Sequence, residues 1–154
     1  MIQDRLDRAI LKHLQMNARL SNQELAELVG LSPSPCWRRV KRLEEMGVIK
    51  GYVALLEPKQ VGTSILAYAQ ISLEDHRPEC IEAFDQFVQS SPQILECCSL
   101  SGQYDYLLKI ITPSMEAYEA FLAKEMLRLS GVRSVNTSFV LNQKKFTTAL
   151  PLEL

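Results

Sequence analysis

The sequence predicts an α+β protein made of a helix-turn-helix domain followed by a ferredoxin-like domain. Three observations support this prediction. Residues 1–50 contain three amphipathic helical segments, and the third is rich in arginine. Residues 57–62 (EPKQVG) interrupt the apolar periodicity, as a domain boundary does. Strand-like and helical segments then follow in the order β-α-β-β-α-β, which is typical of a ferredoxin-like sandwich. We expect the helix-turn-helix domain at 1–50, a linker strand at 51–62 and the ferredoxin-like domain at 63–154.

The first two helices are predicted from apolar spacing and from a capping motif. Segment 4–16 has apolar residues at every fourth position, which predicts one helical face. That face consists of Leu6, Ile10 and Leu14. Ser21-Asn22-Gln23-Glu24 fits a capping box, in which each outer side chain accepts from the other residue's backbone amide. The second helix should end near Gly30. Its inner face is expected to consist of Leu25, Leu28 and Val29.

The third helix is predicted within Ser32–Tyr52 (SPSPCWRRVKRLEEMGVIKGY). Proline is tolerated in a first helical turn, Ser32 or Ser34 can cap that turn, and Gly47 is suited to the helix end. Cys36, Val40 and Leu43 recur at helical spacing and should face the first two helices. We expect Trp37 to be a packing residue rather than a DNA contact.

Four cations on this helix indicate a surface for polyanionic DNA, and the alternative is a solvated basic face. These cations are Arg38, Arg39, Lys41 and Arg42. In a helix-turn-helix the last helix enters the major groove by its N-terminal end. Residues 48–56 form one or two short strands in this interpretation, either as a small wing or as the linker strand.

The second half supplies four strands and two helices. Residues 65–73 alternate in a way that predicts a strand covered on both sides. Pro78 opens a helix that ends at the Ser90-Ser91-Pro92 turn, and Ser114 starts another that Gly131 closes. The helix that starts at Ser114 should bury Met115, Tyr118, Leu122, Met126 and Leu129. The remaining strands are expected at 94–100, 106–111 and 132–141. Because both helices lie on one face of such a sheet, a second copy of the chain is the simplest cover for the other face.

Charge and composition agree with this division. The net charge is −1, but residues 1–60 hold ten Lys/Arg against seven Asp/Glu, whereas residues 61–154 hold seven against eleven. No run of about 20 apolar residues is present for a membrane span, so we expect a cytoplasmic protein. The four cysteines lack metal-ligand spacing and are expected to be free thiols, with a redox role of the vicinal pair as a minor alternative. They are Cys36, Cys80, Cys97 and Cys98.

The chain resembles the Lrp/AsnC family, the leucine-responsive or feast/famine regulators of transcription. The resemblance covers nearly the whole chain. Residues 6–58 (LDRAILKHLQMNARLSNQELAELVGLSPSPCWRRVKRLEEMGVIKGYVALLEP) are similar to the family's DNA-binding half. Residues 101–109 (SGQYDYLLK) resemble its effector loop, although Gln103 stands where an acidic residue is frequent. The resemblance implies dimers that gather into octamers, with an amino-acid effector bound near the dimer–dimer interface.

The resemblance also implies candidate binding residues. The DNA-reading positions are Ser32, Ser34, Arg38, Arg39 and Arg42. The effector-binding positions are Ser101, Gly102, Gln103, Tyr104, Asp105, Met115, Ser138, Phe139 and Val140. Physically, backbone amides at the Gly102 turn suit a carboxylate, and Asp105 can accept from an ammonium. The alternative is an ordinary hairpin turn in which Asp105 is a cap.

We therefore expect a sequence-specific transcription regulator that responds to an amino acid. Apolar residues in the effector set weakly favour leucine or methionine as the effector. Two alternatives remain open at this stage: a ferredoxin-like dimeric enzyme, and an amino-acid-sensing module with no direct DNA role. Because His13 and His76 are isolated from nucleophiles and metal ligands in the sequence, we expect no catalytic activity, no metal and no cofactor apart from the effector.

Overall fold

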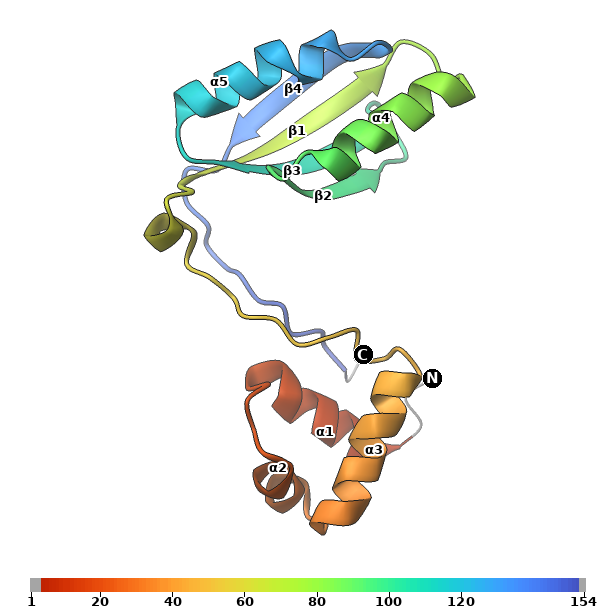
Figure 1. Cartoon of the computed structure of the whole chain (residues 1–154), viewed down its shortest axis with the longest axis vertical. Coiled ribbons are helices and arrows are strands. Elements are labelled where there is room, and N and C mark those ends of the chain that lie inside the picture. Colours follow the sequence, from red (N-terminus) through yellow and green to blue (C-terminus); the bar gives the residue numbers. More distant parts are fainter. Residues whose placement is uncertain (1–3, 153–154) are drawn as a thin grey trace. The chain divides into compact units, whose positions relative to one another are not determined.

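The computed structural model describes residues 4–152, which form two compact units. The first unit contains the chain up to Leu55 together with the residues from Lys145 onward, and the second is Leu56–Lys144 (Figure 1). The predicted fold class is confirmed: the first unit is helical, and the second is an antiparallel sheet with helices.

Three helices build the first unit: α1 (Arg5–Met16), α2 (Asn22–Val29) and α3 (Pro33–Glu45). The predicted capping box is present, because Ser21 accepts from the Glu24 amide and Glu24 accepts from the Ser21 amide. Gly30 follows α2 in the left-handed conformation with φ of 70°, which favours glycine. The three helices enclose one apolar core, formed by Ile10, Leu11, Leu25, Ala26, Cys36 and Leu43.

Three details of these helices differ from the prediction. Ala26 is buried where Leu28 was expected, and Leu28 is exposed. The buried face of α2 therefore consists of Leu25 and Ala26, with Val29 partly buried beside them. Ser32 occupies the position before α3 but its side chain makes no capping hydrogen bond. Trp37 is 53% exposed, so it is not the packing residue that its size predicted.

The linker and the C-terminal residues also differ from the predicted domains. Residues 51–57 are described and form no strand, because a strand needs a hydrogen-bonding neighbour along its length. A short 3₁₀ helix, η1 (Pro58–Val61), follows. The chain from Lys145 belongs to the first unit rather than to the ferredoxin-like domain. Leu152 packs against the core of the first unit, and Gln15 exchanges two hydrogen bonds with the Leu150 backbone.

The second unit is a four-stranded antiparallel sheet in the order β2-β3-β1-β4. Its elements are β1 (Ile65–Leu73), α4 (Pro78–Ser90), β2 (Ile94–Ser99), β3 (Tyr106–Thr112), α5 (Met115–Lys124), η2 (Met126–Arg128) and β4 (Val132–Phe139). Figure 1 shows α4 and α5 on the same face of the sheet, as the β-α-β-β-α-β order predicts. The face of β1 beneath them is fully buried at Ala67, Ala69 and Ile71.

The last helix is shorter than the apolar pattern predicted. It ends at Lys124 and continues as the 3₁₀ turn η2 instead of reaching Gly131 as one helix. Tyr118 and Met126 are buried as expected, but Phe121 is also buried and Met115 is 42% exposed. Met115 therefore lies at the surface, at the N-terminal end of α5.

The two serine positions before α2 and α3 provide a matched test of capping. We expect Ser21→Ala to lower the free energy of unfolding by about 1 kcal/mol, because the Glu24 amide at the start of α2 loses its acceptor. Ser32→Ala should cost much less, since Ser32 makes no side-chain cap. Urea denaturation followed by circular dichroism measures both variants, and equal losses would contradict the assignment.

Candidate functional sites

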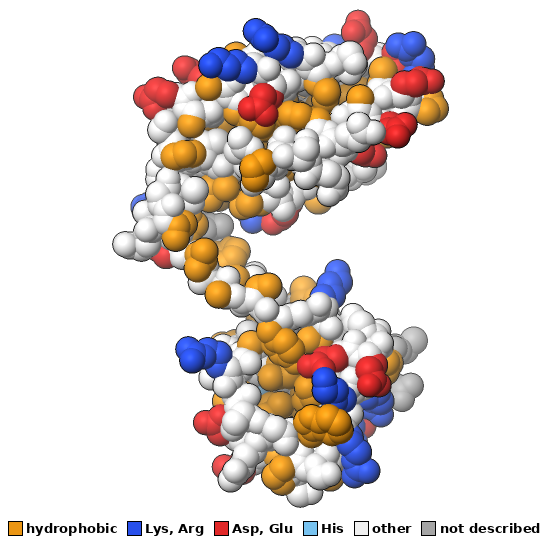
Figure 2. All heavy atoms as spheres, viewed as in Figure 1, with side chains coloured by type: hydrophobic (Ala, Val, Ile, Leu, Met, Phe, Trp, Pro, Cys, Tyr) orange, Lys and Arg blue, Asp and Glu red, His pale blue; other side chains and the backbone are white. Residues whose placement is uncertain are grey.

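The exposed side of α3 is the first candidate site. Ser32, Ser34, Arg38, Lys41 and Arg42 all lie on the surface of this unit. Figure 2 shows Lys and Arg side chains gathered along the edge of the unit that α3 forms. Arg38 makes no ion pair with any residue in the described range 4–152. A shallow hollow at the start of this face is lined by Pro35, Arg38, Arg39 and Arg42.

Asn22 stabilises the turn between α2 and α3. Its Nδ2 donates to the Pro33 carbonyl at 2.8 Å, which ties the first turn of α2 to the first turn of α3. Gly30 supplies the left-handed residue between the two helices. This side-chain hydrogen bond and this backbone conformation stabilise the turn between α2 and α3.

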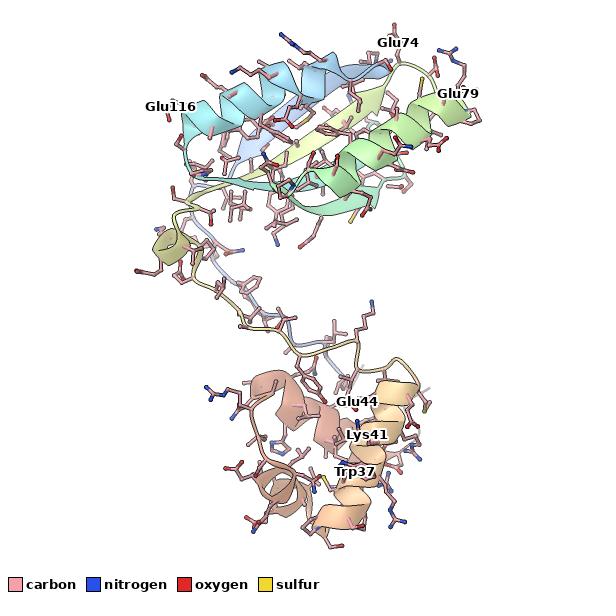
Figure 3. The ribbon with its side chains drawn as sticks, viewed as in Figure 1. Trp37, Lys41, Glu44, Glu74, Glu79 and Glu116 are labelled. Atoms are coloured by element: carbon pink, nitrogen blue, oxygen red, sulfur yellow. The ribbon has the colours of Figure 1, made fainter. Side chains whose placement is uncertain are left out.

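The side of α3 that faces α2 carries a second, mixed group of residues. Figure 3 shows Trp37, Lys41 and Glu44 along α3. Lys41 Nζ lies 3.1 Å from one Glu44 oxygen, and the Tyr52 hydroxyl donates to the other at 3.0 Å. Burial and the Glu44 acceptor raise the pKa of Tyr52 to about 12, so the phenol remains a donor at neutral pH.

The opposite side of α3 is tied to α1 by carboxylates. The side chain of Asp7 is only 1% exposed, and its two oxygens accept from Arg39 Nη1 at 2.8 Å and Arg42 Nη2 at 2.5 Å. Arg39 Nη1 also donates to Asp4 at 2.6 Å. Hydrogen bonds from the Asp7 amide and from Arg39 lower the pKa of Asp4. The Asp4 and Asp7 bonds raise the pKa of Arg39.

This carboxylate network was missed at the sequence level. In the sequence, Asp4 and Asp7 look like ordinary acidic residues in the first turn of a helix. Their three-residue spacing opposite Arg39 and Arg42, which are also three apart, is the signal that could have found it. The structure places Arg39 against α1, so this predicted DNA-reading residue does not lie free on the exposed face as Arg38 does.

The loop at 101–105 is the second candidate site. Ser101, Gly102 and Gln103 are exposed, and Gly102 has φ of 141°, which disfavours any other residue. The backbone of Asp105 donates to the Ile71 carbonyl and accepts from the Leu100 amide. Tyr104 Oη accepts from Asn136 Nδ2 at 3.1 Å, so the loop also reaches β4.

Asp105 fixes this loop to the end of β1. One carboxylate oxygen accepts from the Leu73 amide at 2.7 Å, and the other contacts His76 Nε2 at 2.8 Å. The Leu73 amide and His76 lower the pKa of Asp105. Both oxygens therefore already have a partner within the chain, as in the alternative interpretation of Asp105 as a cap.

The remaining predicted effector residues lie at the other end of the sheet. The register pairs Phe139 with Ala67, and the Val140 amide donates to the Leu66 carbonyl. Met115 follows the end of β3, where Thr112 pairs with Ile65. Leu66 and Leu73, to which Asp105 is bonded, are seven strand steps apart, so Asp105 lies roughly 23 Å from the Val140 end of the sheet. The structure does not bring the nine predicted effector residues together within one copy.

Other candidate chemistry is weak in the described part of the chain. No group of three His, Cys, Asp or Glu residues there is arranged to hold a metal ion. All four cysteines are free thiols, and Cys97 and Cys98 are both exposed on β2. His76 is bonded to Asp105 alone among the described residues. No described helix is long and apolar enough to cross a membrane.

Comparison with known proteins adds independent findings. Residues 3–50 match a winged helix-turn-helix DNA-binding model, and residues 66–150 match the Lrp/AsnC ligand binding domain. The chain is 44% identical over 150 residues to the leucine-responsive regulatory protein of Escherichia coli K12, covering 97% of this chain and 92% of that protein. Among solved structures, a Neisseria meningitidis transcriptional regulator in complex with L-methionine is 41% identical, with a TM-score of 0.95 over 98% of this chain and 97% of the other. Escherichia coli AsnC is 28% identical, with a TM-score of 0.89 over 98% and 100% of the two chains.

The pairing of Asp105 predicts a pH-dependent stability of the second unit. Because its pKa is lowered in the folded state, Asp105 stabilises the fold above the ordinary carboxyl pKa of about 4 and ceases to do so as pH falls through its folded pKa. Asp105→Asn should therefore lower the free energy of unfolding by about 1–2 kcal/mol at pH 7, and the difference should shrink toward pH 3. Chemical denaturation at several pH values measures this, with the exposed Glu119→Gln on α5 as the control. A pH-independent difference would contradict the assignment.

Proposed function

The chain belongs to the Lrp/AsnC family of transcription regulators, with a helix-turn-helix DNA-binding domain and an amino-acid-binding domain, and we propose that it reads DNA through α3 and responds to leucine or methionine. The observation that carries the DNA-reading part is the exposed basic face of α3. Arginine forks bind guanine edges and phosphates, and a helix of this kind enters the major groove.

The DNA contacts we propose are Ser32, Ser34, Arg38 and Arg42. Their exposure supports this set, and so does the hollow beside Pro35 that three arginines line. Arg39 is left out of the set because its Nη1 is bonded to Asp4 and Asp7. In this proposal Arg38 is the principal phosphate contact, since it has no competing ion pair in the described range.

The effector we propose is an apolar amino acid. Two relatives support this chemistry: one is named for its response to leucine, and another was solved with L-methionine. Exposed apolar surface at Met115 and Phe139 is consistent with a side chain of that kind. The exposed backbone around Gly102 offers amides for the carboxylate.

We further propose that two copies of the chain complete each effector site. Within one copy Asp105 lies at one end of β1 and the residues Met115, Phe139 and Val140 lie at the other, too far apart for one amino acid to contact both. Packing one copy's loop against the other end of a second copy's sheet would bring the two groups together. Assembly into dimers and larger oligomers is part of this proposal.

The proposed activity is binding rather than catalysis. The relatives are transcription regulators, and we propose that this chain acts in the cytoplasm, without a cofactor other than its effector. The pairing of His76 with Asp105 supports a structural role for that histidine.

Replacing Arg38 tests the DNA-reading proposal. We expect Arg38→Ala to weaken DNA binding about tenfold and to reduce the slope of log affinity against log salt by about 1, because one phosphate contact is lost. Fluorescence anisotropy with a labelled duplex measures both quantities. Lys124→Ala, an exposed cation on α5, is the control and should change neither. Absence of DNA binding by the wild type at low salt would contradict the proposal.

A thermal-shift screen over the twenty amino acids tests the effector proposal. A ligand that binds only the folded protein raises its melting temperature, so leucine or methionine should give the largest shift. A response to asparagine or lysine alone would contradict the apolar assignment.

The same readout tests whether two copies share a site. Gly102→Val should abolish the loop's contribution to effector binding, because valine is strained at φ of 141°. Met115→Lys should abolish the contribution of the group at Met115 and 138–140 to effector binding. Each variant alone should lose the shift. Oligomers that mix the two variants should regain part of it, because some sites then combine two intact halves. No recovery in proven mixed oligomers would place the site within one copy.

A further inference from the structure

Asp7 joins two arginines of α3 to α1 through one hydrogen bond to each. Its buried carboxylate uses both oxygens, one for each guanidinium. Arg39 is further held by Asp4, and its side chain is 25% exposed against 45% for Arg42. A buried carboxylate is stable only when its charge is compensated, so the pairing is retained while α1 and α3 are packed.

The group as a whole is electrically balanced. Two carboxylates, Asp4 and Asp7, face two guanidinium groups, Arg39 and Arg42. Arg42 donates one N–H from Nη2 to Asp7, whereas a guanidinium carries five N–H donors in a fixed fork. The fork of Arg42 is therefore anchored to Asp7 through Nη2, while its side chain stays 45% exposed at the surface.

Without the bonds to Asp7, Arg39 and Arg42 would bind DNA with little regard to its sequence. Arginines released from carboxylates bind phosphates wherever they meet them, and phosphate contacts carry no base information. A fixed fork, in contrast, contacts a base edge only at the correct position and register. The same carboxylate thus keeps one arginine from the phosphates and orients another toward the bases.

We propose that Asp7 is a specificity-determining positioning residue, which withholds Arg39 from the DNA backbone and orients Arg42 for base reading. This inference rests on the proposed DNA-reading role of α3. It assigns sequence discrimination partly to a buried residue of α1 that does not itself touch DNA.

The test compares wild type and Asp7→Asn on two duplexes of equal length. One is selected by the wild-type protein from a random library, and the other is a scrambled version of it. We expect Asp7→Asn to bind the scrambled duplex more tightly, with a salt slope steeper by about 1, because an arginine becomes available to phosphate. The preference for the selected duplex should fall about tenfold, because the Arg42 fork loses its anchor.

Two further variants separate positioning from net charge and from misfolding. Glu27→Gln removes a negative charge from the exposed side of α2 and should leave the preference for the selected duplex unchanged. Asp7→Asn combined with Arg39→Met restores the charge balance, so its binding to the scrambled duplex should return to the wild-type value while the preference remains reduced. This double variant also avoids an unbalanced buried charge if the single variant does not fold, and thermal melts report folding for each protein.

The possible outcomes are distinguishable. Unchanged preference and unchanged salt slope in folded Asp7→Asn, with a wild type that discriminates, would overturn the role of Asp7 and leave the DNA-reading function standing. A wild type that enriches no sequence from the library would contradict the proposed function itself. An equal loss of preference in Glu27→Gln would reduce the effect to charge and also overturn the role of Asp7.

Discussion

Each unit of this protein positions its candidate binding residues with one carboxylate that has two partners. In the first unit Asp7 joins α1 to two arginines of α3. In the second, Asp105 joins its loop to the end of β1 through the Leu73 amide and contacts His76. The Asp7 carboxylate is removed from water and needs such partners, whereas Asp105 is 28% exposed; in both cases the bonds hold the carboxylate against the elements to which its partners belong. The orientation of the α3 arginines and the position of the loop both depend on these bonds.

The antiparallel sheet imposes a second constraint, which concerns distance. Because β1 is nine residues long and pairs with β3 and β4 along its length, groups at its two ends stay apart. A single amino acid cannot join Asp105 to the Met115 and Phe139 group of the same copy. In our proposal, effector binding is therefore coupled to assembly: the effector stabilises a contact between copies, and the spacing of the α3 helices on DNA depends on that contact.

Local sequence signals predicted most of the secondary structure. The capping box at Ser21 and Glu24, the proline at 78 and the alternating pattern of 65–73 each act within a few residues, and each is present as predicted. Signals that depend on a distant partner were less reliable. The strands expected within 48–56 do not form, and the C-terminal residues belong to the first unit, where Leu152 packs against the core and Gln15 binds Leu150.

The sequence by itself determined the fold class, the family, the basic helix α3 and the exposed glycine turn at 102, because spacing, capping and motif are local properties of the chain. Only the tertiary structure decided what the charged residues do. Asp7 and Arg39 look like surface residues in the sequence, yet the packing of α1 against α3 buries the first and joins it to the second. Likewise, only the strand register separates Asp105 from Phe139. Burial and distance arise when segments far apart in the chain meet; the matched spacings of Asp4 with Asp7 and Arg39 with Arg42 agree with the pairing but do not fix which residue is buried.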